Sequence, residues 1–179
     1  GGSPLKIVPS RRTASAVLRA ELPGRRAQRR FAPQLSYGRQ YGPPAHDARD
    51  AAILLLLFPH EGHWHVPLTR RPDHLGEHAG QISFPGGLTE PGESPELAAA
   101  RELAEELDVD TGQVTLIGRL SPMYVYASNY LMTPVVGFTP ARPAMKPNPD
   151  EVAEVLEMPI EQLVDRRNYG CHHMDRGAV

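Results

Sequence analysis

The most regular hydrophobic pattern in the chain lies within residues 86–109 and predicts an amphipathic helix in the second half of that stretch. Ser94 is suited to cap the start of the helix, and Pro95 is suited to its first position. The apolar residues recur at helical spacing, so they are expected to form one stripe that faces the core: Leu97, Ala100, Leu103, Ala104 and Leu107.

Two runs of strand-forming residues predict a β-hairpin ahead of this helix. Residues 51–58 are almost all apolar, as expected for a strand that is buried on both faces. Residues 60–62 predict a turn, and residues 64–69 return as the second strand. His63 and His65 alternate along it and could bind a metal. A polar outer face is preferred, because no third ligand lies nearby in the sequence.

Beyond the helix, the pattern predicts shorter elements. Residues 114–120 and 131–138 are predicted strands, and Pro134 indicates that the second is an edge strand or contains a bulge. Residues 121–129, between them, predict a loop, and a later short helix is predicted to end at Val164. Three tyrosines at this loop could stack on an adenine ring or pack on the surface: Tyr124, Tyr126 and Tyr130.

The first part of the chain is strongly basic. Nine of the 19 basic residues precede position 41, where Glu21 is the only acid. A short helix with apolar residues 17, 18 and 22 on one face is predicted to end at Pro23-Gly24. The arginines that follow are expected on a solvated arm, with contact to an acidic ligand or partner as the alternative: Arg25, Arg26, Arg29 and Arg30.

Composition and segment lengths narrow the class of protein. Residues 32–47 predict an extended connection, which divides the chain into an arm, residues 1–47, and one domain, residues 48–179, whose C-terminal end we expect to be truncated. The net charge of −2 gives no overall attraction to nucleic acid, and no apolar run is long enough to span a membrane. A single cysteine, Cys171, fits a cytoplasmic or other reducing intracellular compartment. The sequence leaves the oligomeric state open, with a homodimer as one expectation.

Three glutamates fall together near the C-terminal end of the predicted helix. At about 100° per residue, Glu102, Glu105 and Glu106 share an arc of about 100°. The helix dipole disfavours negative charge at this end, so these carboxylates would be destabilising unless a cation joined them. A hard divalent ion such as Mg²⁺ or Mn²⁺ prefers oxygen ligands of this kind, and the alternative is a solvated acidic face.

The residues around these glutamates follow a fixed spacing. Gly87 is followed by five residues, Glu93, seven residues and then Arg-Glu-Leu-Ala-Glu-Glu at positions 101–106. This pattern resembles the Nudix box, although the family usually has glycine where this chain has Asp108. The resemblance implies an α/β fold, an α/β/α sandwich with a mixed β-sheet, in which an ion pair between Glu93 and Arg101 holds the loop to the helix.

The segment just upstream resembles a second motif, found in the coenzyme A pyrophosphatase branch of the Nudix family. Pro67 replaces the first leucine of that motif, and Arg71 stands before Pro72 where the family often has serine. The other positions agree: Leu68, Thr69, Gly80, Gln81 and Phe-Pro-Gly-Gly at positions 84–87.

The second motif implies a binding surface for phosphate. Arg70 and Arg71 would bind phosphate oxygens, for which guanidinium groups are well suited, and Gly80 and Gln81 would shape the wall beside them. The alternative for Arg70 is an ion pair with a surface carboxylate.

Together the two resemblances imply hydrolysis of the diphosphate of coenzyme A or acyl-coenzyme A, giving 3′,5′-ADP and (acyl-)4′-phosphopantetheine. Glu105 or Glu151 would take the proton from the attacking water, since the family places a carboxylate at the position of Glu151 opposite the acidic helix. Mg²⁺ or Mn²⁺ would be held by three carboxylates and one backbone carbonyl: Glu102, Glu105, Glu106 and Gly86.

Two other functions are compatible with the sequence. The first is a Nudix hydrolase of another nucleoside diphosphate derivative, such as a dinucleotide, a nucleotide sugar or a damaged nucleoside triphosphate. The departures at Pro67 and Arg71 leave this alternative open. The second is a non-catalytic nucleotide-binding module of the same fold, which the retained carboxylates disfavour.

Overall fold

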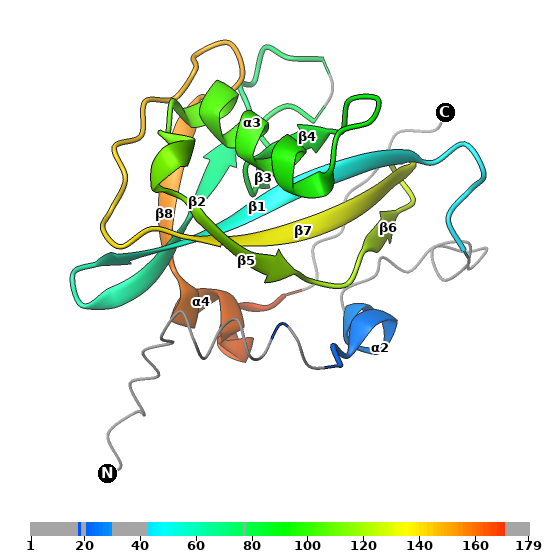
Figure 1. Cartoon of the computed structure of the whole chain (residues 1–179), viewed down its shortest axis with the longest axis horizontal. Helices are drawn as coiled ribbons and strands as arrows, with labels where there is room; N and C mark the ends of the chain where they lie inside the picture. Colours follow the sequence, from blue (N-terminus) through cyan, green and yellow to red (C-terminus); the bar gives the residue numbers. More distant parts are fainter. Residues whose placement is uncertain (1–17, 19–20, 30–42, 77, 171–179) are drawn as a thin grey trace.

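A computed structural model of the protein describes residues 18, 21–29, 43–76 and 78–170, which form a mixed α/β fold around an eight-stranded sheet (Figure 1). The long strand β1 (Arg49–His60) lies at its centre and pairs in parallel with β7 (Tyr130–Phe138). The other strand pairs of the described residues are antiparallel. The remaining strands are β2 (His63–Arg70), β3 (Ile82–Ser83), β4 (Gly86–Leu88), β5 (Thr115–Arg119), β6 (Met123–Val125) and β8 (Glu154–Pro159).

Helices lie on both faces of the sheet, which confirms the predicted sandwich of layers. The helix α3 (Pro95–Leu107) covers one face, and α2 (Gly24–Gln28) and α4 (Ile160–Val164) lie on the other (Figure 1). Two 3₁₀ turns follow α3 and α4, namely η2 (Thr111–Gln113) and η3 (Arg166–Asn168). No helix in the described part of the chain is both long and apolar enough to cross a membrane.

The strands β1 and β2 form the predicted hairpin because the sequence supplies the turn that it needs. Glu61 and Gly62 have φ angles of 48° and 80°, as a type I′ turn requires, and this turn matches the twist of the flanking strands. The expectation that His65 lies on a polar outer face was wrong. Its ring is buried because the rings of Phe58 and His60 pack against it, with centroids 5.9 and 5.3 Å from its own.

The strand β7 lies inside the sheet, so the expectation that Pro134 marks an edge was wrong. It has β1 on one side, and β5 and β6 succeed each other along the other side. Pro134 falls in the gap between β5 and β6, where its carbonyl accepts a hydrogen bond from Leu120 at 2.8 Å and its missing N–H removes no ladder bond. An irregularity lies in the neighbouring strand β5, whose register shifts between Leu116 and Gly118.

The short helix α2 begins at Gly24, where a helix was predicted to end. Pro23 immediately precedes it, a position that suits proline because a helix start leaves N–H groups without partners. Gln28 connects α2 to the loop before β6, since its Nε2 donates to the carbonyls of Ser121 and Pro122 at 3.1 and 3.2 Å. The arginines of this segment that the structure describes are exposed: Arg25, Arg26 and Arg29. Several positions named above lie outside the described residues: Val17, Arg30, residues 32–42 and Cys171.

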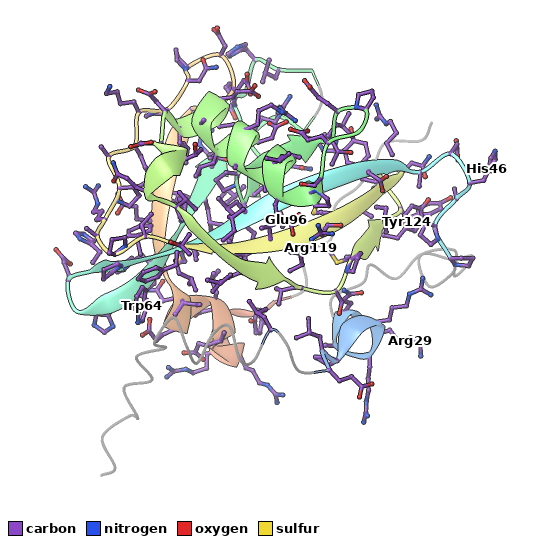
Figure 2. The ribbon with its side chains drawn as sticks, in the orientation of Figure 1. Arg29, His46, Trp64, Glu96, Arg119 and Tyr124 are labelled. Carbon is purple, nitrogen blue, oxygen red and sulfur yellow. The ribbon has the colours of Figure 1, made fainter. Side chains whose placement is uncertain are left out.

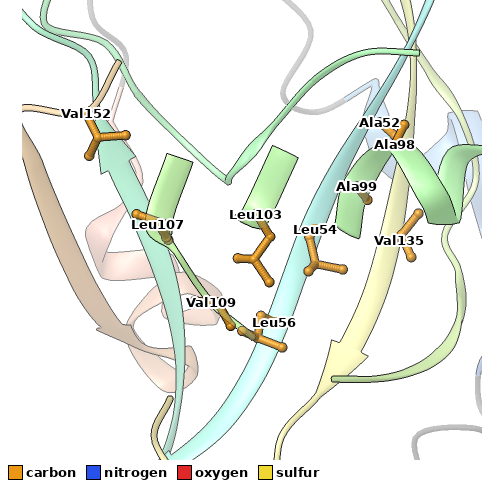
Figure 3. Packing of buried hydrophobic residues seen from close by; sticks show 10 residues of the cluster. All are labelled: Ala52, Leu54, Leu56, Ala98, Ala99, Leu103, Leu107, Val109, Val135 and Val152. Atoms are coloured by element: carbon orange, nitrogen blue, oxygen red, sulfur yellow. The ribbon is translucent and has the colours of Figure 1, made fainter. Parts of the chain in front are cut away.

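The main core lies between α3 and the sheet (Figure 3). Leu103 and Leu107 are fully buried there, as predicted. The prediction for Leu97 was wrong, because its side chain is 64% exposed and Ala98 and Ala99 face the sheet in its place. A helix can approach a sheet closely only through small side chains, so the orientation of α3 follows its alanines as well as its leucines. The partners of α3 in this cluster come from the sheet and its neighbouring loops: Ala52, Leu54, Leu56, Val109, Val135 and Val152.

The orientation of α3 can be tested by truncating one leucine on each side. Leu103→Ala is expected to lower the free energy of unfolding by about 2–5 kcal/mol, because it leaves a cavity in the core. Leu97→Ala, the matched control on the same helix, should change it by less than about 0.5 kcal/mol, since Leu97 is exposed. Urea unfolding followed by circular dichroism measures both values. Equal losses in the two variants would show that α3 is rotated differently.

Candidate active site

Both ends of α3 are capped by side chains or conformations that the sequence supplies. The Oγ of Ser94 accepts the N–H of Leu97 at 3.3 Å, which confirms the predicted cap. At the other end Asp108 adopts the left-handed conformation, with φ 52° and ψ 34°, and its N–H donates to Ala104. Glycine is the usual residue at such a position, and aspartate is one of the few others that adopt it readily. The departure from the Nudix box is therefore accommodated at the helix C-cap.

The loop that carries Glu151, which the Nudix resemblance placed opposite the acidic helix, closes the C-terminal end of α3. The N–H of Lys146 donates to the carbonyl of Leu107 at 2.7 Å, and the N–H of Asn148 donates to the carbonyl of Glu106 at 2.8 Å. These bonds satisfy carbonyls that a helix end leaves free. The side-chain amide of Asn148 also lies 3.4 Å from Glu151 Oε1, so the same loop brings Glu151 to the acidic helix. Sequence reasoning missed the two backbone bonds, for which Asn148 is a signal, since it turns the chain by accepting the N–H of Asp150 at 3.2 Å.

The strand β4 passes directly beneath the acidic face of α3, where two glycines leave room for the neighbouring atoms. A Cβ on Gly86 would lie 2.3 Å from the carbonyl oxygen of Ala52, and a Cβ on Gly87 would lie 2.5 Å from Glu102 Oε1. The N–H of Gly86 donates to the carboxylate of Glu106. The two glycines thus let β4 fit between β1 and the glutamates.

Arg101 connects the loop before α3 to the helix through an ion pair with Glu93, as predicted. Its Nε and Nη2 each lie 3.1 Å from an oxygen of Glu93, and Nη2 also donates to the carbonyl of Leu88 at 2.9 Å. Its Nη1 bridges Glu102 and Glu105 at 2.8 and 2.9 Å. One guanidinium therefore holds the loop and two of the three clustered glutamates.

Glu106 occupies a different environment from its two neighbours on the helix. It lies in the middle of the buried face of α3, with 9% of its surface exposed, and its Oε2 has no hydrogen-bond partner among the described residues. Burial raises the pKa of Glu106 to about 8, and the nearby charges of Glu102 and Glu151 act in the same direction. The Gly86 N–H and the positive charge of Arg71 lower the pKa only in part. Glu106 is therefore a buried acid with a strongly raised pKa.

Residues from three separate segments meet at this point of the fold. Burial also raises the pKa of Glu102, and the charges of Glu105 and Glu151 contribute to that shift, so Glu151 acts on both Glu102 and Glu106. Arg71 is close enough for its charge to act on Glu106. The structure therefore brings together the helix glutamates, Glu151 and Arg71.

The other predicted binding residues lie on the segment that follows β2. The N–H of Arg71 donates to the carbonyl of Gln81 at 2.9 Å, and the N–H of Gly80 donates to the carbonyl of Arg71 at 3.2 Å. Arg70, at the end of β2, is paired with Asp73 and Glu154. The carboxylate alternative for Arg70 is thus the arrangement that the structure has.

The carboxylate oxygens of this site are ligands of the kind that a hard divalent cation prefers. Glu106 offers a buried oxygen without a partner, and Glu102 lies against the space that Gly87 leaves free. Within the described ranges, however, no three histidine, cysteine or carboxylate side chains already converge tightly enough to hold a metal. Arg101 engages one oxygen of Glu102 and one oxygen of Glu105.

The tyrosines that could have stacked on a nucleobase have partners of their own. Tyr124 donates to Asn129 Oδ1 at 2.8 Å, and Arg49 lies 4.8 Å from the centre of the Tyr130 ring. Figure 2 shows Tyr124 near one end of the sheet. The ion pair between Glu96 of α3 and Arg119 of β5, also labelled there, does not include it. These contacts agree with the surface-packing alternative.

Comparison with known proteins identifies relatives of this arrangement. A family model described as NUDIX domain matches residues 48–174. Proteins named uncharacterized Nudix hydrolase NudL, from Photorhabdus laumondii and Yersinia pestis, are 38% identical over 109 residues, which is 60% of this chain and 57% and 53% of theirs. The chain thus spans little more than half the length of these curated relatives.

Solved structures show the same fold. A Nudix hydrolase from M. smegmatis, RenU, is 25% identical with a TM-score of 0.56, over 65% of this chain and 73% of that one. A C. elegans Ap4A hydrolase has the same TM-score at 18% identity, over 68% of this chain and 87% of its own, and shows the likeness of fold alone.

The state of Glu106 predicts how stability depends on pH. An exposed glutamate in the unfolded chain releases its proton near pH ~4.3, whereas Glu106 in the folded, metal-free protein keeps it up to about pH 8. From about pH 5 to about pH 8 the free energy of unfolding should therefore fall, by at most about 1.4 kcal/mol per pH unit from this group. Glu106→Gln should remove that slope, and exposed Glu90→Gln should keep it. Urea unfolding with EDTA across this range measures it, and an unchanged slope in Glu106→Gln would contradict the assignment.

The position of Glu102 above Gly87 predicts a selective loss of metal binding. Gly87→Ala places a methyl group where the Glu102 carboxylate now lies, so Mn²⁺ affinity should fall by at least about tenfold. Gly170→Ala is the matched control, because its Cβ would meet nothing within 4 Å. Calorimetric titration of the metal-free proteins with Mn²⁺ measures the effect. Unchanged affinity in Gly87→Ala would exclude Glu102 as a ligand.

Proposed function

The chain belongs to the NUDIX family, and from that premise we propose that it is a metal-dependent hydrolase that cleaves the diphosphate of coenzyme A or an acyl derivative. The products would be 3′,5′-ADP and (acyl-)4′-phosphopantetheine. The observation that carries the catalytic part of the proposal is the buried carboxyl of Glu106, with an unpartnered oxygen beside Glu102 and Glu151. The segment after β2, which resembles the coenzyme A motif, supports the choice of substrate.

A diphosphate repels an anionic nucleophile, so the site must supply positive charge and remove a proton. A divalent cation such as Mg²⁺ or Mn²⁺, when bound, would neutralise phosphate charge and acidify a water molecule. The residues proposed to hold it are Glu102, Glu105 and Glu106, with the carbonyl of Gly86 as a neutral donor. Arg101 keeps the loop and helix in register through Glu93 and Leu88, so its role is to support the ligands.

Glu105 and Glu151 are the two candidates for the general base. Glu105 would have to leave Arg101, with which it forms an ion pair at 2.9 Å. Glu151 would leave only the neutral amide of Asn148, at 3.4 Å. Because an ion pair with a guanidinium holds a carboxylate more strongly than a hydrogen bond from a neutral amide does, we place Glu151 first.

Arg71 is the residue that we assign to substrate phosphate. Its charge already acts on Glu106, so a phosphate held there would lie beside the carboxylates. Gly80 and Gln81 are joined to the backbone of Arg71 and would form the wall beside it. Arg70, by contrast, is engaged by two carboxylates. A reducing compartment and a homodimer stay predictions.

A panel of diphosphates tests the proposal directly. With Mg²⁺ or Mn²⁺ the protein should release 3′,5′-ADP from coenzyme A, identified by mass spectrometry. Glu106→Gln should lower turnover by at least about a hundredfold while the circular dichroism spectrum is unchanged, because a ligand is lost. Glu161→Gln, an exposed acid on α4, is the control and should keep full activity.

The outcomes separate the alternatives. Turnover confined to dinucleotides, nucleotide sugars or nucleoside triphosphates would show that the protein is a Nudix hydrolase whose substrate is not coenzyme A. Tight nucleotide binding without turnover of any diphosphate would indicate a binding module.

A further inference from the structure

Arg70 connects two segments that are far apart in the sequence. Its Nη1 lies 3.1 and 3.3 Å from the two oxygens of Asp73, and its Nε lies 3.3 Å from Glu154 Oε2. The carbonyl of Arg70 also accepts the N–H of Ala153 at 2.8 Å. We call Arg70, Asp73 and Glu154 the Arg70 clasp.

The first segment held by the clasp carries Arg71. It is closed on itself by the hydrogen bonds from Arg71 to Gln81 and from Gly80 to Arg71. Gly80 has a φ of 68°, and a Cβ there would come within 3.0 Å of Asp73 Oδ1, so the aspartate lies against this turn. Asp73 thus contacts both Arg70 and the turn beside Arg71.

The second segment held by the clasp carries Glu151. The N–H groups of Glu151 and Val152 both donate to the carbonyl of Asn148, at 3.0 and 2.8 Å, and Ala153 then bonds to Arg70. Glu154 begins β8 and pairs with Arg70 in the strand register. The chain from Asn148 to Glu154 is therefore fixed at one end by α3 and at the other by Arg70.

Both segments lie near Glu106. The second is bonded to it directly, since the N–H of Asn148 donates to the carbonyl of Glu106 at 2.8 Å, and the charges of Arg71 and Glu151 both act on the Glu106 carboxyl group. We infer that Arg70 is a positioning residue, whose clasp couples the segment of Arg71 to the segment of Glu151 and so fixes both beside Glu106. The inference rests on the proposed function only for the roles of Arg71 and Glu151. In this role Arg70 holds the two segments in place and does not itself contact phosphate.

Stability alone does not explain this arrangement. All three side chains of the clasp are partly or largely exposed, and exposed ion pairs contribute little to the free energy of unfolding. The planar guanidinium can hold two carboxylates in a fixed geometry, which a lysine cannot do. The chain offers a matched control in Arg142, whose guanidinium pairs with Glu157 of the same strand β8, with Nε 2.7 Å from Oε2. That pair lies outside the residues that converge on Glu106.

Hydrogen exchange in the metal-free protein tests the coupling without any assay of activity. The probes are the amides of Arg71 and Gly80 in the first segment and Ala153 in the second. Asp73→Asn changes only the first segment, yet it should speed exchange at Ala153 by at least about threefold. Glu154→Gln should likewise speed exchange at Arg71 and Gly80. Arg142→Gln should leave all three amides unchanged, and the α3 amides should stay protected in every variant.

Variants that loosen only their own segment, or neither segment, would overturn the inference. Both substitutions are at exposed side chains, so folding should be retained even if Arg70→Gln were unstable. Once turnover of coenzyme A is measured, Arg70→Gln should lower kcat and raise KM, each by about tenfold, and Arg70→Lys should recover only part of either. If the wild type turns over no diphosphate, the proposed function fails while hydrogen exchange still decides the coupling.

Discussion

The burial of the Glu106 carboxyl on the packed face of α3 is the constraint on which the rest of the site depends. A buried acid needs donors and space, and here it receives the Gly86 N–H while one oxygen stays without a partner among the described residues. The helix can lie this close to the sheet because Ala98 and Ala99 are small and β4 contributes glycines. The leucines at positions 103 and 107 flank the acid, and their burial offsets the cost of keeping it there.

Similar residues at neighbouring positions of one helix have acquired different properties through packing. Glu105 is exposed and paired with Arg101, Glu102 is mostly buried and paired with the same guanidinium, and Glu106 is buried against the backbone. The helix dipole disfavours all three, and Arg101 compensates two of them. Arg101 is thus an internal cation that engages two of the three proposed ligands.

Features that depend on local chemistry could be predicted from the sequence. Features that depend on which elements pack together in the fold could not. The hairpin, the Ser94 cap and the ion pair of Glu93 with Arg101 depend on turn residues, a hydroxyl and a fixed helical spacing, all of which are local. Leu97, His65 and Pro134 were misassigned because their exposure depends on which element packs beside them. In the Asn148 loop, the resemblance indicated Glu151 but not the two backbone N–H bonds to α3, since any residue could supply those bonds.

The groups that converge on Glu106 are held by interactions of unequal strength. The helix is fixed by the core, whereas the segments that carry Arg71 and Glu151 are fixed by backbone hydrogen bonds and by exposed ion pairs. Loss of such a pair changes the free energy of unfolding by less than about 1 kcal/mol, yet a displacement of about 1 Å can cost a large factor in rate. Selection for activity can therefore retain surface contacts that selection for stability would not. A site built in this way is most sensitive at its loops, while the hydrophobic core that positions α3 sets whether the protein folds.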